Sequence, residues 1–392
     1  MPGVWRPGAL AGRLGDGRSS YRRCVARERY GARRRWSLVV ALVAVLAALP
    51  ALIGALPASH SRVSATDLRA AVLGSADVPF SGYAESAGGL ALPVTDQLTS
   101  LADLFSDRTT MRVWWRSAIN NRVDVLTATG ETDVHRDSEG SWTWEYESNR
   151  VTRTDAAPLA LPAPADLLPP ALGRRLLSEA SDDELSRIEP IRIAGRDAPG
   201  LRLVPAEAAS SVARVDLWAD AATGLPLKIR VYAKGASAPA LDTRFLDLDL
   251  ATPSPEVTGF VPPPGARVIR DPQNEVLDEA NRRLRPVSLP HELVGLARRT
   301  IEGAPGAIIL YGRGVTLLAV VPVPQRVAGS LRQAAAASPS AVDDELGVRL
   351  AAGPVSIMVV GAPGEQTYVL TGTVTLDALE SAARALPELR RG

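Results

Sequence analysis

The chain has 392 residues, enough for two or three domains with cores of their own. Its formal net charge is only +1, yet residues 1–36 contain ten arginines and only two acidic residues. The rest of the chain is therefore acidic overall, which argues against binding to a nucleic-acid backbone. Cys24 is the only cysteine, so the region after it can hold no disulfide and must be stabilised by packing.

The first element is an apolar segment near the N-terminus. Residues 38–57 carry no charge and are long enough to cross a hydrocarbon core about 30 Å thick. The arginines at 33–35 precede it, which places the N-terminus inside and the main body outside the cytoplasm. We therefore expect a basic cytoplasmic tail (1–36), then a transmembrane anchor or signal h-region (37–57). The main body is expected outside the cell membrane, with secretion after cleavage at Ala65 as the alternative.

A short helix and a meander of strands are expected after the apolar segment. Thr66 is placed to cap a helix that runs to about Ala76, and residues 96–105 predict a second short helix. Alternation of apolar and polar residues predicts strands at 80–86, 111–116, 122–125 and 142–146. His135 is interpreted as part of a polar turn between two of these strands.

One face of this meander is expected to be apolar. Its residues are Met111, Val113, Trp115, Trp142, Trp144 and Tyr146. They suit either a packed core or the wall of a cavity that receives an acyl chain, and residue types alone do not separate the two. Trp114 and Trp218 lie among charged residues, so we expect them on the opposite face as exposed contact points.

Residues 165–183 predict the one helical insertion, which Pro169 and Pro170 interrupt. Its apolar stripe comprises Leu167, Leu168, Leu172, Leu176 and Leu177. A helix with such a stripe must bury it against another element. We expect Leu168 and Leu172 to join the apolar face of the sheet in holding a ligand.

Residues 213–232 predict two strands joined by a turn at Thr223 and Gly224. Gly224 is expected to adopt a positive φ, which a β-branched residue would not tolerate. Asp216, Asp220, Asp247 and Asp249 fall on the polar faces of strands, where we expect a solvated convex surface.

The sequence pattern of this hairpin resembles that of the LolA/LppX-like superfamily, especially its RseB/MucB-like branch. The pattern is D-x-W-x-D-x-x-T-G-L-P-L, from Asp216 to Leu227. The segments VPFSGYAES at 78–86 and FVPPPGA at 260–266 extend the resemblance to about residues 66–266. It implies an α+β fold: a curved antiparallel half-barrel sheet with helices across its concave face. The resemblance also implies binding of lipid or lipoprotein rather than catalysis.

A smaller C-terminal α+β domain is expected at 291–392, after a linker rich in proline and charge at 267–290. Strands are predicted at 307–311, 315–321, 348–351, 355–360 and 368–372, with a helix at 325–337. Thr375 is placed to cap the last helix.

No catalytic or metal-binding set can be assembled from the sequence. His60, His135 and His291 have no Cys, His or Asp partners at the spacing of metal ligands. The sequence also lacks the G-x-S-x-G, P-loop and G-x-G-x-x-G motifs. We expect no enzyme activity, no cofactor and no metal.

The leading hypothesis is a non-enzymatic extracytoplasmic binding protein, an RseB-like regulator of envelope signalling. It would sense an apolar or acylated envelope ligand or a partner protein, such as an anti-sigma factor or another membrane protein. The alternative is a lipid or lipoprotein carrier in envelope transport or cell-wall assembly. The predicted ligand-binding residues on the apolar concave face are Met111, Val113, Trp115, Trp142, Trp144, Tyr146, Leu168 and Leu172.

Overall fold

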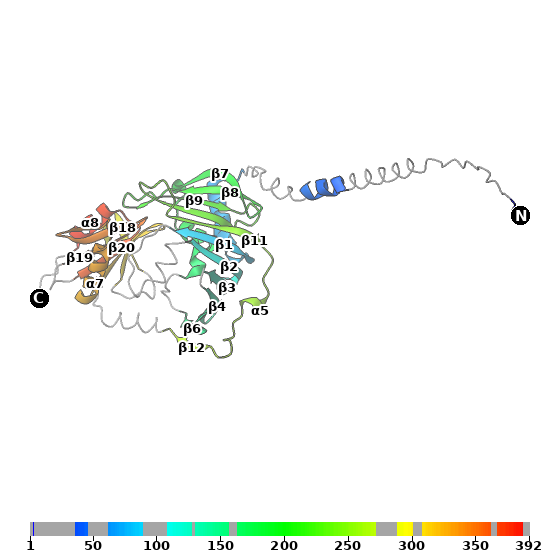
Figure 1. Cartoon of the computed structure of the whole chain (residues 1–392). Helices are drawn as coiled ribbons and strands as arrows, with labels where there is room; N and C mark the ends of the chain where they lie inside the picture. Colours follow the sequence, from blue (N-terminus) through cyan, green and yellow to red (C-terminus); the bar gives the residue numbers. More distant parts are fainter. Residues whose placement is uncertain are drawn as a thin grey trace. The chain divides into compact units, whose positions relative to one another are not determined.

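The computed structural model of the chain describes residues 3, 36–45, 62–88, 108–127, 130–156, 163–271, 288–300, 308–361 and 367–386 (Figure 1). The chain forms two units, Met1–Leu56 and Pro57–Gly392. In the first unit, residues 36–45 are helical. Within the described ranges, no helix has the length and hydropathy needed to span a membrane. The rest of the predicted anchor and the helix expected at 96–105 lie outside the described residues.

A twelve-stranded curved sheet, cyan through green to the yellow β12 in Figure 1, dominates the second unit. Its strands are β1 (Phe80–Gly88), β2 (Arg108–Ser117), β3 (Asn120–Leu126), β4 (Glu131–Asp137), β5 (Gly140–Glu145), β6 (Arg150–Asp155), β7 (Leu185–Ile193), β8 (Arg196–Leu203), β9 (Val212–Ala219), β10 (Pro226–Ala233), β11 (Leu241–Asp249) and β12 (Arg267–Arg270). Their spatial order is β12-β6-β5-β4-β3-β2-β1-β11-β10-β9-β8-β7. Neighbours are antiparallel except β12 and β6, which are parallel. The expected large antiparallel sheet is confirmed.

Three strands of this sheet differ from the sequence prediction. β4 occupies the residues interpreted as a polar turn, so His135 is a buried strand residue. β6 was not predicted. β12 lies in the stretch expected to begin a linker, where it pairs with β6 along its whole length.

Helices cover one face of the large sheet. They are α2 (Ala65–Gly74), η1 (Ser75–Asp77), η2 (Pro164–Leu167), α4 (Pro169–Leu177) and η3 (Asp182–Glu184), with the single turn α5 (Pro255–Thr258) near β2 and β3. Ser64, rather than Thr66, caps α2: its Oγ accepts a hydrogen bond from the Asp67 amide at 3.0 Å. Gly173 lets α4 approach the sheet closely, because a Cβ there would crowd Leu217 and Pro226.

The turn between β9 and β10 depends on Gly224, whose φ is +72° as expected. A Cβ at this position would also collide with the backbone carbonyl of Ala71 in α2. The turn therefore needs glycine for its conformation and for contact with the helix.

A second sheet of eight strands follows, yellow to orange in Figure 1. Its strands are β13 (Glu292–Leu293), β14 (Leu296–Arg299), β15 (Ile309–Arg313), β16 (Thr316–Val323), β17 (Val342–Asp344), β18 (Gly347–Ala352), β19 (Val355–Val360) and β20 (Thr367–Gly372). The order is β13-β14-β15-β16-β20-β19-β18-β17. Helices α7 (Gln325–Ala336) and α8 (Leu376–Ala385) pack against it. Thr375 caps α8 as predicted, since its side chain accepts from the Ala378 amide at 3.2 Å.

Candidate functional site

The helix-covered face of the large sheet contains part of the predicted ligand-binding set. Met111, Val113 and Trp115 project from β2 into a core that also includes Leu168 of the covering segment. All four side chains are buried, and Leu172 packs against them half-buried. These five residues are therefore brought together in one packed core, to which η2 and α4 contribute.

Aromatic rings order the centre of this core. Phe80 of β1 stacks on Trp115 with ring centroids 5.7 Å apart, and meets Phe245 of β11 edge to face at 5.5 Å. The Trp115 Nε1 is buried without a hydrogen-bond partner among the described residues. A buried donor left unpaired costs free energy, so this is the one polar atom in the aromatic cluster that a bound group could satisfy.

A buried hydrogen bond attaches the covering segment to the sheet. The Thr243 hydroxyl of β11 donates to the Leu167 carbonyl at 2.7 Å. On the other side, Arg69 of α2 donates to the carbonyls of Leu177 and Ser178 at 3.0 and 3.2 Å. Arg69 thus satisfies carbonyls at the end of α4 that have no partner within the helix.

The other predicted aromatic residues lie on the opposite face of the sheet. Residues directly opposite each other on neighbouring strands share a face. Val113 faces Val123, which faces Val134, and Val134 faces Thr143. Trp142 and Trp144, on either side of Thr143, therefore point away from the Met111 side. The prediction of a single face was wrong, because the unpredicted strand β4 shifts the alternation by one residue.

Trp144 and Tyr146 form an edge-to-face pair on that opposite face, with ring centroids 5.4 Å apart. Tyr146 is 63% exposed. Trp114 is half-buried under the guanidinium groups of Arg112 and Arg122. The expectation of an exposed Trp218 was wrong: it is 7% exposed, and its Nε1 donates to the Glu189 carbonyl at 3.0 Å.

The acidic residues of this face are largely buried in ion pairs. Asp216 pairs with Arg202 at 2.6 Å and Asp220 with Arg196 at 2.7 Å, and both carboxylates are buried. Asp247 and Asp249 are exposed as expected. The solvated surface predicted for all four aspartates is therefore present only at the end of β11.

Asp124, Glu131 and Asp133 bring carboxylate oxygens within 4.8 Å of one another. Arg122 donates to Asp124 at 2.6 Å and to Asp133 at 2.8 Å, and Arg112 pairs with Asp124 and Glu131. Two guanidinium groups thus take the place that a cation would occupy. Burial and the charge of Asp124 raise the pKa of Asp133 to about 7.

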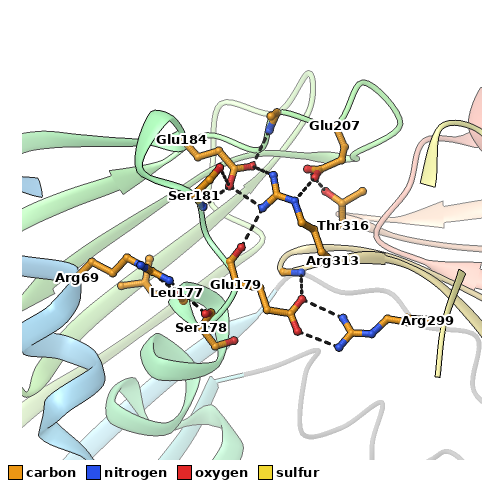
Figure 2. A network of polar contacts seen from close by, with 12 residues as sticks. Arg69, Leu177, Ser178, Glu179, Ser181, Glu184, Glu207, Arg299, Arg313 and Thr316 are labelled. Atoms are coloured by element: carbon orange, nitrogen blue, oxygen red, sulfur yellow. Dashed lines mark hydrogen bonds and ion pairs between the residues drawn. The ribbon is translucent and has the colours of Figure 1, made fainter. Parts of the chain in front are cut away.

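Five charged residues, which we call the clamp, join the segment after α4 and the β8–β9 connection to the second sheet (Figure 2). Its members are Glu179, Glu184, Glu207, Arg299 and Arg313. Arg299 of β14 donates twice to the Glu179 carboxylate, at 2.9 Å each, and the Gly314 amide donates to it at 2.7 Å. Arg313 of β15 binds Glu184 at 3.0 and 3.1 Å and Glu207 at 2.9 Å.

Glu184 is the most buried member of the clamp. Although burial opposes its charge, hydrogen bonds from Arg313, Ser181 and the Ala206 amide hold its pKa down at about 2. Hydrogen bonding by Arg299 and the Gly314 amide likewise lowers the pKa of Glu179. Glu179 and Glu184 are therefore ionised at neutral pH.

The sequence prediction did not include the clamp. One local signal was present: Ser181 and Glu184 form a capping box, in which each side chain bonds the other's backbone. That spacing predicts the start of η3 but gives no information about Arg313, which is 129 residues away.

No family model matches the sequence, and no curated protein matches it. Among solved structures, the chain is similar to MucB in its complex with MucA(peri), at 17% identity and a TM-score of 0.48, covering 83% of this chain and 100% of that one. The chain is also similar to the MucA/MucB complex of Pseudomonas aeruginosa, at 18% identity and a TM-score of 0.48. That match covers 83% of this chain and 99% of the other. A LolA superfamily protein from Nitrosomonas europaea is similar at 12% identity and a TM-score of 0.25. That match covers 50% of this chain and 98% of the other. The solved structures that the chain resembles thus include MucB and a LolA superfamily protein.

Proposed function

We propose that the chain is a non-enzymatic extracytoplasmic binding protein that regulates envelope signalling. Its large sheet binds an apolar or acylated ligand, or a partner protein, and the binding is transmitted to the second sheet. The clamp is the observation that carries this proposal. The partner class, an anti-sigma factor or another membrane protein, and the location outside the cytoplasm belong to the same proposal.

Ligand binding is coupled to the second sheet because a ligand that enters the core must break contacts of the covering segment. Met111, Val113 and Trp115 are buried in one core with Leu167, Leu168 and Leu177 of the covering segment, so an apolar group that enters this core displaces residues of that segment. Displacement of α4 pulls on Glu179, which follows the helix directly and holds Arg299 and Gly314. Binding beneath α4 and attachment of the β14–β16 region are therefore linked equilibria.

This linkage favours a regulator over the alternative, a lipid or lipoprotein carrier. A carrier requires only that its covering segment open and close over the ligand. A regulator additionally requires that opening change a second surface, and the clamp connects α4 to such a surface. The hydrogen bond from the Thr243 hydroxyl to the Leu167 carbonyl must break when the covering segment separates from the sheet.

The test measures ligand binding and exchange together on the full-length chain. A fluorescent fatty acid is titrated onto the protein, and backbone hydrogen exchange is followed at residues 309–316. We expect binding to raise exchange there. Arg299→Ala should raise exchange before any ligand is added, whereas Arg298→Ala should match the wild type, because Arg298 is exposed and its side chain makes no ion pair among the described residues.

Two other outcomes are informative. Binding of the fatty acid with unchanged exchange at 309–316 would favour the carrier. No binding by the wild-type chain would remove the apolar ligand and leave the partner protein alone. A reporter fused after residue 65 tests the location, since activity of a cytoplasmic reporter there would contradict the envelope assignment.

A further inference from the structure

The large sheet ends at one edge in β12, a strand with a neighbour on one side only. β12, yellow in Figure 1, pairs with β6 and with no other strand among the described residues. The opposite edge, β7, contains Pro190 and pairs irregularly between Ile188 and Ile191, and such features discourage pairing with another chain. β12 has no proline and pairs regularly, so it is the edge of this sheet that suits a further strand.

Backbone groups of β12 point alternately towards β6 and away from it. The amides of Arg267 and Asp271 donate to carbonyls in and just before β6, at 3.0 and 2.8 Å. Because the bonding side alternates from residue to residue along a strand, Val268 and Arg270 direct their N–H and C=O groups outward. These outward groups have no hydrogen-bond partner in the described part of the chain. Two such residues, two positions apart, are the pattern to which an antiparallel strand bonds.

The side chains of β12 expose an apolar group between two cations. Val268 is 51% exposed, and Arg267 and Arg270 are exposed as well. The Arg270 guanidinium lies 3.6 Å from the carboxylate of Asp155. Arg267, in contrast, forms no ion pair with any residue that the structure describes. Arg267 is therefore the cation of this edge that an incoming carboxylate can neutralise.

The sequence of residues 267–271, Arg-Val-Ile-Arg-Asp, is complementary to itself when two copies run antiparallel. A two-fold axis at Ile269 places Arg267 opposite Asp271 of the second copy, and Val268 opposite Arg270. The outward backbone groups of Val268 then exchange both hydrogen bonds with those of Arg270. Arg267 and Asp271 form a pair without backbone hydrogen bonds between them, the kind in which opposed side chains come closest. The symmetry repeats each of these contacts, so the dimer contains two such ion pairs.

Charge favours this register over the others that the edge could adopt. In-register parallel pairing would place Arg267 opposite Arg267 and Arg270 opposite Arg270, and like charges directly opposed are destabilising. An antiparallel axis at Arg270 would also oppose two arginines. With the axis at Ile269, Arg270 lies opposite Val268, which its aliphatic stem covers while its guanidinium stays near Asp155. The partner that fits both the charges and the hydrogen bonds of β12 is therefore β12 itself.

We infer that β12 is a self-association surface, through which two copies of the chain join their large sheets by antiparallel pairing about Ile269. β12 has four residues, so the pairing buries less than the roughly 1,200–2,000 Å² of a standard stable interface. The dimer is accordingly weak, with a Kd of about 0.1 mM. This surface goes beyond the proposed function, because it lies at the sheet edge and does not require α4 to move.

The test reverses the two charges on the full-length chain and measures sedimentation equilibrium between about 5 and 500 µM. Arg267→Asp and Asp271→Arg should each weaken self-association by about tenfold or more, because each opposes like charges at two places in the dimer. An equimolar mixture of these two variants should associate about as tightly as the wild type, since every reversed charge then meets its complement. The double variant should also associate like the wild type. Arg298→Asp is the matched control, a charge reversal at an exposed arginine of the second sheet, and should leave association unchanged.

Val268→Pro tests the backbone hydrogen bonds. Proline removes the outward amide of this residue and leaves the bonds between β12 and β6 in place, so the variant should melt close to the wild type. Its self-association should be at least about tenfold weaker, and any that remains measures association through other surfaces. The proposal is overturned if the wild type sediments like Val268→Pro up to about 500 µM, which would leave the edge to a strand of another protein. It is also overturned if the two mixed charge variants associate no more tightly than each does alone.

Discussion

Arg313 and Glu184 form a bidentate ion pair, with Nη1–Oε2 at 3.0 Å and Nη2–Oε1 at 3.1 Å, across 129 residues of sequence. The Glu184 side chain is 4% exposed and that of Arg313 is 39% exposed. A pair with one buried partner is asymmetric: loss of the arginine leaves a buried carboxylate with less than its full set of donors.

We therefore expect Arg313→Ala to lower the free energy of unfolding by about 1–3 kcal/mol, below the range for fully buried pairs because Arg313 is partly hydrated. Urea denaturation of the full-length chain measures this loss. Arg150→Ala is the control, since it pairs with the half-buried Glu145 from an exposed position and the pair should be worth less than about 1 kcal/mol. Equal losses in the two variants would mean that the clamp contributes little to stability.

The clamp should also weaken in acid. The pKa of Glu184 in the folded chain, about 2, lies below its ordinary value of 4.5, so its ionised form stabilises the fold at any pH above about 4.5. This contribution is lost as the pH falls from about 4.5 towards 2. The stability difference between wild type and Arg313→Ala should therefore shrink over that window, as measured by urea denaturation at several pH values. A stability difference between wild type and Arg313→Ala that stays constant down to pH 2 would contradict this prediction.

The β9–β10 turn gives a prediction that differs from the one drawn from sequence. Asp220 was expected to be an exposed charge, but it is 3% exposed and accepts hydrogen bonds from Arg196, the Thr223 amide and the Thr223 hydroxyl. Asp220→Ala should then cost about 2–4 kcal/mol. Asp247→Ala, which removes an exposed carboxylate, should cost under about 0.5 kcal/mol. Thermal unfolding would contradict this if the two variants melted together.

Gly224→Val should be at least as damaging as Asp220→Ala. Valine is disfavoured at a φ of +72°, and its Cβ would overlap the Ala71 carbonyl, so the turn and α2 must both shift. We expect a loss of about 3 kcal/mol or more, again by thermal unfolding. A melting temperature near that of the wild type would show that α2 can move away at little cost.

The sequence correctly predicted those features of the fold that depend on residues close together in the chain. The cap at Thr375 and the positive φ of Gly224 each depend on residues within one turn of chain. The alternation of side chains between the two faces of β9 and β10 could likewise be predicted, because one short turn joins these two strands. These features need no knowledge of distant partners.

The candidate site was less predictable because it depends on register between strands. Trp142 and Trp144 alternate in their own strand just as Met111 and Val113 do in theirs. Which face they share is decided by β4 between them, and β4 resembles a polar turn because Asp133, His135 and Asp137 are polar. Those polar residues are tolerated in the strand because Arg122 pairs with Asp133, Arg153 pairs with Asp137, and the Thr258 carbonyl, 123 residues away, bonds His135.

Asp133 provides the last prediction. Its carboxylate is buried beside Asp124 and Glu131, and accepts a hydrogen bond from Arg122 at 2.8 Å. Burial and the charge of Asp124 raise its pKa to about 7 from an ordinary value of 3.8. Between these values the folded chain holds a proton that the unfolded chain has released. Stability from this group is thus fully present below about pH 3.8 and is lost as the pH rises to 7.

Asp133→Asn should remove that loss, because the amide keeps an oxygen for Arg122 and carries no charge to desolvate. We expect the variant to be more stable than the wild type at pH 8 by about 1–3 kcal/mol, and to lose this advantage near pH 4. Urea denaturation of both proteins at the two pH values measures the difference, in which other titrating groups cancel. A variant less stable than the wild type at pH 8 would mean that the Asp133–Arg122 attraction outweighs the cost of burying a second carboxylate beside Asp124.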